Sequence, residues 1–211
     1  MAYNLSTVRE RVRNRLDDED FEQEYLDRAI NYAQWDITNN SNLRFLETTQ
    51  PYTLNEGDHT LDLPSDFHAY KYLRLSAPVD FRMNLTDAYK DYDDFVNDYI
   101  DPTVFSESVP YHWSEFGSKI IFSAPADQTY TINLDYQRRA AELVNEDDVP
   151  DIPEEFAELL EIGAYMRIAK REDDYDVKSA EMADYSKLLL DLKSVYGRKK
   201  GPGGLRKMRV A

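Results

Sequence analysis

The chain has no cysteine and little glycine, and both absences remove classes of chemistry. Because none of its 211 residues is cysteine, disulfides, zinc–thiolate sites, iron–sulfur clusters and thiol catalysis are excluded. Only 7 residues are glycine, which leaves little material for loops that hold phosphates. No run approaches the roughly 18 apolar residues of a membrane-spanning helix, and the N-terminus lacks the apolar segment of a signal peptide. The sequence predicts a soluble intracellular protein without a membrane partner.

Catalytic and metal-binding signatures are also missing. The chain has three histidines, His59, His68 and His112, and their spacing does not suit a metal site. Neither H-E-x-x-H nor G-x-S-x-G occurs in the sequence. The run 91–94 begins like a calcium loop, but Phe95 and Val96 stand where a ligand and a glycine are required. The 41 acidic residues offer so many carboxylate pairs that no single pair is informative. We therefore expect no catalytic residue, no metal and no cofactor.

Charge is divided unevenly along the chain. Residues 198–211 hold six basic residues and no acid, whereas the remaining 197 residues carry 19 basic and 41 acidic side chains, a net charge of −22. One interpretation is a solvated body with a frayed end. The other is a tail that docks on an acidic partner while the body repels polyanions.

Helical periodicity occurs at both ends of the chain. Thr7 and Glu10 fit a capping box before a helix that ends at Leu16, and the acidic turn 17–20 suits the start of a second helix through Ile37. After Val149, the pattern predicts a third helix with Pro153 in its first position. A last helix runs to Tyr196, where Gly197 can cap it.

The middle of the chain is typical of antiparallel strands. Short aromatic and β-branched segments alternate with turn residues, and the turns 56–58 and 116–118 both indicate hairpins. Residues 129–137 alternate as one half-buried strand, with Tyr130 and Ile132 on its apolar face. Residues 86–99 are better predicted as a short helix with Thr86 as N-cap. Few Lys or Arg residues accompany the aromatic ones here, which disfavours stacking on nucleic-acid bases: Tyr70, Tyr72, Tyr89, Tyr92, Phe95 and Tyr99.

These patterns predict an α+β fold. Its helical domain, residues 1–45 and 150–197, is expected to be a four-helix bundle built from the N- and C-terminal helix pairs. Residues 46–149 form an inserted antiparallel β domain, and residues 198–211 form an extended basic tail.

Several segments, in this order, resemble the head-to-tail adaptor (connector) proteins of tailed bacteriophages. They are Leu63-Pro-Ser-Asp-Phe67 with Tyr72-Leu-Arg-Leu75, then Asp148-Val-Pro-Asp-Ile-Pro-Glu-Glu-Phe156 leading into Leu159-Leu-Glu-Ile-Gly-Ala164, and finally Tyr185-Ser-Lys-Leu-Leu-Leu-Asp-Leu192. The order and spacing of the segments over residues 5–197 carry the resemblance.

The resemblance implies a non-enzymatic virion protein of the neck, between head and tail, that is assembled in the host cytoplasm. About twelve copies would form a ring under the portal protein, extend the DNA channel and present a platform to a tail or nozzle protein. Double-stranded DNA would pass through without specific binding, since an acidic wall repels phosphate. Two alternatives stay open: another neck component, such as a nozzle or tail-completion protein, and a carboxylate-based hydrolase.

The basic tail is the predicted portal-binding site. Glycine and proline after Tyr196 prevent the helix from continuing. Apolar residues then alternate with basic ones, which suits an extended segment that makes both apolar and charged contacts. The residues are Arg198, Lys199, Lys200, Leu205, Arg206, Lys207, Met208, Arg209 and Val210.

Overall fold

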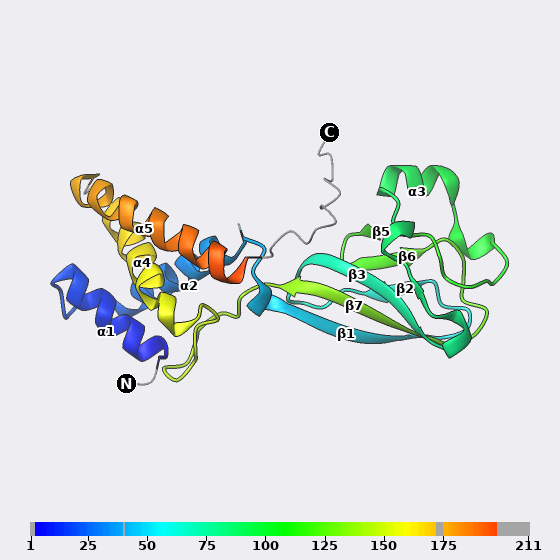
Figure 1. The fold of residues 1–211 in the computed structure, drawn as a ribbon, viewed down its shortest axis with the longest axis horizontal. Helices are drawn as coiled ribbons and strands as arrows, with labels where there is room; N and C mark the ends of the chain where they lie inside the picture. The colour runs from blue at the N-terminus through cyan, green and yellow to red at the C-terminus, as the bar shows by residue number, and fades with distance from the viewer. Residues whose placement is uncertain (1–2, 40, 172–174, 198–211) are drawn as a thin grey trace. The chain divides into compact units, whose positions relative to one another are not determined.

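The computed structural model describes residues 3–39, 41–171 and 175–197, and it divides the chain into two compact units (Figure 1). One unit, called here the helical unit, comprises residues 1–46 and 139–211; the other, the β unit, comprises residues 47–138. The described residues contain five α-helices and two antiparallel sheets, so the predicted α+β class is confirmed.

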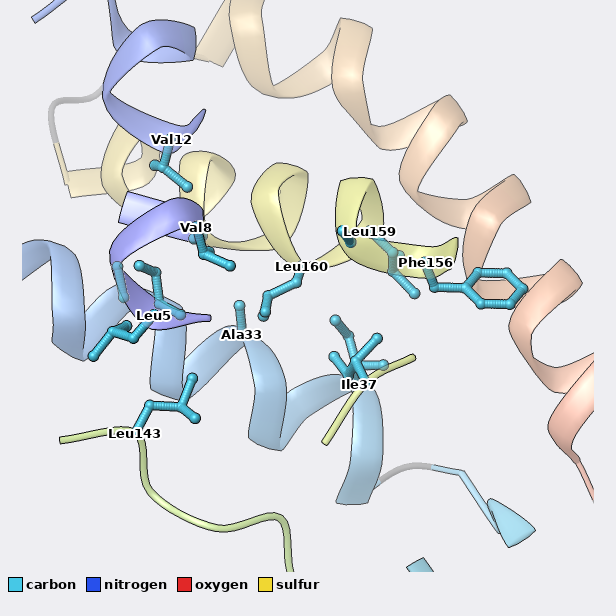
Figure 2. Close-up of a cluster of buried hydrophobic side chains, with 14 of the residues drawn as sticks. Leu5, Val8, Val12, Ala33, Ile37, Leu143, Phe156, Leu159 and Leu160 are labelled. Carbon is cyan, nitrogen blue, oxygen red and sulfur yellow. The ribbon is translucent and has the colours of Figure 1, made fainter. Parts of the chain in front are cut away.

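The helical unit contains α1 (Leu5–Leu16), α2 (Gln23–Asn39), α4 (Ala157–Arg171) and α5 (Tyr175–Tyr196). Helix α4 contacts each of the other three, and α1 also contacts α2. The buried apolar residues of α2 and α4 meet in one core, to which α1 also contributes. Figure 2 labels part of this core: Leu5, Val8, Val12, Ala33, Ile37, Leu143, Phe156, Leu159 and Leu160. Burying a Leu or Ile side chain contributes about 1.5–3 kcal/mol, so this core holds the helices together.

Helix starts differ in detail from the predicted ones. Asn4, not Thr7, caps α1: its side-chain oxygen accepts the Thr7 N–H at 3.0 Å, which places Thr7 inside the first turn. Helix α2 begins at Gln23, beyond the acidic turn 17–20. Pro153 precedes a short 3₁₀ turn, Glu154–Phe156, that leads into α4. At the far end, the Gly197 N–H donates to the Lys193 carbonyl at 2.9 Å and the helix ends at Tyr196, as expected.

The segment 139–152 has no regular structure, yet it belongs to the helical unit and not to the β region where the sequence placed most of it. Two buried amides of α2 hold its backbone. Asn31 donates to the Leu143 carbonyl at 2.9 Å and accepts the Leu143 N–H at 2.8 Å. Gln34 donates to the Ala141 carbonyl at 2.8 Å and accepts the Asp151 N–H at 2.9 Å. These side chains replace the partners that a strand neighbour would supply.

The β unit is built from two sheets with a shared core. One has the order β1-β7-β3-β4 and the other β2-β6-β5, all with antiparallel pairs. The strands are β1 (Glu47–Leu54), β2 (Thr60–Asp62), β3 (Phe67–Ala77), β4 (Met83–Asn84), β5 (Trp113–Phe116), β6 (Lys119–Phe122) and β7 (Tyr130–Arg138). Alternate residues of β7 are buried, as predicted: Tyr130, Ile132, Leu134 and Tyr136. They share a core with Trp113, Ile120 and Phe122 of the second sheet.

Two predictions for the β unit are wrong. Residues 56–58 form a turn but no hairpin, because β1 pairs with β7 whereas β2 pairs with β6 in the other sheet. Residues 86–99 are not one helix: α3 covers only Tyr92–Asp98 and its N-cap is Asp91. The Thr86 hydroxyl instead accepts the Leu73 N–H of β3 at 3.0 Å. The hairpin through Gly117, by contrast, is confirmed as β5 and β6.

Candidate interaction surfaces

The predicted portal-binding tail, residues 198–211, lies outside the described residues. The structure does show where it starts. Gly197 forms an isolated antiparallel bridge with Leu43, and the Arg44 side chain donates to the Val195 carbonyl at 2.7 Å. The basic segment therefore follows directly from a fixed point of the helical unit.

Helix α5 exposes three apolar side chains to solvent. Leu190 is 67% exposed, and Met182 and Val195 are also exposed. Lys187 and Lys193 are exposed on the same helix. The three apolar side chains point in different directions around the helix and alternate with charged ones, so the exposed side of α5 is mixed in character.

A groove of about 330 Å³ runs beside α2, where this helix meets the segment 139–149. Its apolar lining includes Trp35 and the exposed side chains of Tyr32 and Val144. Charged residues border it: Glu24, Asp27, Arg28 and Glu142. Asp27 forms an ion pair with the buried Arg9, whose Nη2 lies 2.8 Å from Oδ2. The helical unit thus carries a groove that combines apolar and charged groups.

The most distinctive surface lies in the β unit and is called here the 91–118 surface. These residues run through α3, a 3₁₀ turn at Pro102–Val104 and strand β5 to the hairpin turn; α3 packs against β5 (Figure 1). Five large apolar side chains of this segment are exposed: Ile100, Val104, Phe105, Tyr111 and Phe116. They account for five of the thirteen such residues in the described part of the chain.

Ring contacts fix the 91–118 surface in place. Tyr92 of α3 stacks on Phe116 with ring centroids 4.2 Å apart. Tyr99 contacts Phe105 at 5.9 Å and His112 at 5.8 Å, and Tyr111 lies 4.8 Å from His112. Offset and edge contacts of this kind contribute about 0.5–1.5 kcal/mol each, so the exposed rings are held before any partner arrives.

The same surface is strongly acidic. Residues 91–118 contain seven Asp or Glu residues and no Lys or Arg. Hydrogen bonds from Thr103 to the Asp101 side chain hold the pKa of Asp101 below its usual range, whereas burial raises the pKa of Glu115. Lys90, just outside the segment, forms an ion pair with Asp98. The surface therefore presents apolar rings within a negative field.

Other aromatic residues of the β unit pack against its core. Tyr70 and Tyr89 have ring centroids 5.5 Å apart, and Tyr89 lies 5.0 Å from the buried Trp113. Burial raises the pKa of both tyrosines. These rings stabilise the β unit, whereas Tyr92 and Tyr99 contribute to the 91–118 surface.

Neither a metal centre nor a membrane segment was found in the part of the chain that the structure describes. Within it, no three His, Asp or Glu side chains come together as a potential metal site. None of the helices searched there combines the length and apolar character required to cross a bilayer. The described residues do carry exposed apolar side chains gathered in the segment 91–118, a feature that often marks a contact surface.

Comparison with known protein families assigns the chain to one of them. The sequence matches the family model described as SU10 adaptor protein over residues 3–206, and the chain belongs to this family. No curated protein matches the chain. Family membership makes it a structural adaptor protein of a phage virion, one that interacts with portal and tail components at the neck. The resemblance seen in the sequence is thereby confirmed.

Sequence reasoning missed the 91–118 surface although a signal was present. From the sequence we predict a short helix over residues 86–99 and no contact surface in this segment. Its composition is unusual: seven aromatic residues accompany the seven acids within 28 positions. A solvated face does not need aromatic residues. That coincidence of acids and rings is the sequence feature that could have indicated a contact surface.

Proposed function

We propose that the chain is a head-to-tail adaptor whose copies, about twelve in number, form a closed ring beneath the portal. The ring would extend the DNA channel and give the tail its attachment platform. The observation that carries this proposal is the family match over residues 3–206. The same match favours an adaptor over a nozzle, a tail-completion protein or a hydrolase, and we expect no catalytic turnover.

The wall of the ring would consist of helical units, each acting as a four-helix bundle. A closed ring of identical copies requires two different, complementary faces on each copy. The exposed side of α5, which carries Leu190, and the groove beside α2 would serve as these two faces. If the helical unit makes the lateral contacts, the β unit is left for contact with the phage tail.

The charge distribution agrees with a DNA conduit. A body of net charge −22 repels phosphate, so DNA would slide through without adhering. The same charge opposes assembly, because neighbouring bodies repel one another. We therefore propose that the isolated protein is a monomer or a weak ring, firmer when salt shortens the Debye length to about 8 Å or less.

The basic tail is the part that we assign to the portal. Leu205, Met208 and Val210 would occupy apolar pockets, and the six basic residues would pair with acidic groups of the portal. The alternative role for this segment is non-specific neutralisation of packaged DNA, which would depend steeply on salt.

Deleting residues 198–211 separates these two roles. We expect the fold to be unchanged and stable docking on purified portal rings to be lost, as measured by co-sedimentation. A full-length variant with Leu205→Ser, Met208→Ser and Val210→Ser keeps every charge and should also dock poorly. If both variants dock like the unchanged chain and only DNA retention in particles falls, the proposal that residues 198–211 bind the portal is wrong.

A further inference from the structure

We propose that the 91–118 surface is the docking site for the tail-side component, and that it binds a Lys/Arg-rich segment carrying apolar side chains. The inference rests on the proposed adaptor function and adds to it the location of the site and the chemistry of the partner. Three observations carry it: exposed apolar side chains, ring contacts that hold the aromatic ones in place, and the sign of the surrounding charge.

The apolar side chains of this surface are exposed to water and do not contribute to the core of the β unit. Ile100 is 84% exposed, Val104 75% and Phe116 56%. Leaving such groups in water forgoes the free energy that burial of apolar surface releases. A partner that covers them recovers this free energy, and aromatic side chains are the residues most enriched in the centres of protein interfaces.

The surface is arranged in advance of binding. Beneath it, the Trp113 indole donates to the Leu85 carbonyl at 2.6 Å, and the Lys90 N–H donates to the Trp113 carbonyl at 2.9 Å. Tyr92, stacked on Phe116, joins α3 to the tip of the β5–β6 hairpin. Because the rings are already held, a partner loses less entropy in ordering them.

The charge identifies the partner. Seven acids without a Lys or Arg over residues 91–118 favour a positively charged segment and increase the rate at which it is captured. The adjacent cations are engaged at the edges of the surface: Lys90 with Asp98, and Lys119 with Asp62 at 3.5 Å. DNA would be repelled by this field, and so would the same face of a second copy.

A phage carrying variant adaptors tests the proposal on assembled particles. The surface variant is Asp93→Asn, Asp94→Asn and Glu107→Gln. The matched control removes the same charge from the exposed acidic stretch before α2: Glu19→Gln, Asp20→Asn and Glu22→Gln. Adaptor copies per head are measured by quantitative mass spectrometry, and heads with tails are counted by electron microscopy.

The surface variant should keep its adaptors on the head but lose tails at least about tenfold, as loss of several charge contacts predicts. The control should retain both. A second variant, Ile100→Ser with Phe105→Ser, keeps the charge and should also lose tails. Normal tail attachment by both surface variants, or an equal loss in the control, overturns the proposal. If even unmodified adaptors are absent from heads, it is the adaptor function itself that fails.

Second-site suppressors identify the occupant. For a phage with Asp94→Lys, the proposal expects restored growth through replacement of Lys or Arg by an acidic residue in a tail-side protein. Suppressors that fall in codons 198–211 of the chain itself would show that the surface binds the protein's own tail, and suppressors in the portal would show that it faces the head. Either result overturns the proposal.

Discussion

At the scale of single residues, Asn31 and Gln34 show how two polar side chains can decide where a segment belongs. Both are buried within the apolar stripe of α2. Each amide donates to one backbone carbonyl and accepts one backbone N–H of the segment 139–152. The sequence contains both residues but not their partners, which lie more than a hundred positions away.

Replacing Asn31 by Leu should destabilise the protein by about 2–3 kcal/mol, because the Leu143 N–H and carbonyl are left buried without partners. Gln23→Leu, at an exposed position on the same helix, should change the free energy of unfolding by less than about 0.5 kcal/mol. Urea denaturation of both variants checks this. Equal stabilities would show that the segment is held by other contacts.

The environment of Tyr136 indicates that the stability of the protein falls at alkaline pH. Burial, together with the hydrogen bond to Asp66 at 2.8 Å, raises the pKa of Tyr136 to about 12. Because the folded pKa lies above the unfolded value of about 10, this group's contribution to stability is complete below pH 10 and is lost as the pH rises toward 12.

Tyr136→Phe should therefore lose less stability than the unchanged protein between pH 9 and pH 12, although it starts lower at pH 9. Urea denaturation across this pH range measures the difference, and ultraviolet titration should show one high-pKa tyrosine fewer. Parallel stability curves for the two proteins would contradict the assignment.

At the scale of elements, what could be predicted depended on sequence separation. The β5–β6 hairpin and the alternation of β7 follow from neighbouring residues, and both predictions are confirmed. The partner of β1 is β7, some eighty positions away, so a turn at 56–58 suggested a hairpin that does not exist. The extent of α3 depended on Thr86, whose hydroxyl is engaged by β3. Such long-range partners have no local signature.

Gly163 of α4 lies close to side chains of both α2 and α5. A Cβ at this position would lie 3.1 Å from the Ala33 Cβ and 3.3 Å from the Tyr185 ring. Gly163→Val should destabilise the helical unit by about 1–3 kcal/mol, since overpacking forces its neighbours apart. Ala183→Val, at an exposed position of α5, is the matched control and should cost less than about 1 kcal/mol. Thermal unfolding compares them, and equal costs would refute the close packing.

At the scale of the whole molecule, the sequence predicted the class and the family but not the contact surfaces. Order and spacing of segments were enough for the adaptor resemblance, because they reflect the succession of elements along the chain. The 91–118 surface depends on α3 lying against β5 and on rings meeting across that contact. The predicted portal-binding residues lie beyond Gly197, outside the described residues, and their role remains a proposal.

The central claim is that this protein assembles as a ring on the portal. Electron microscopy of the purified chain mixed with purified portal rings tests it most directly, with native mass spectrometry to count the subunits. The account predicts two coaxial stacked rings with about twelve copies of this chain, in keeping with closed cyclic symmetry. A chain that stays monomeric beside intact portal rings, or a stoichiometry far from twelve, would contradict it.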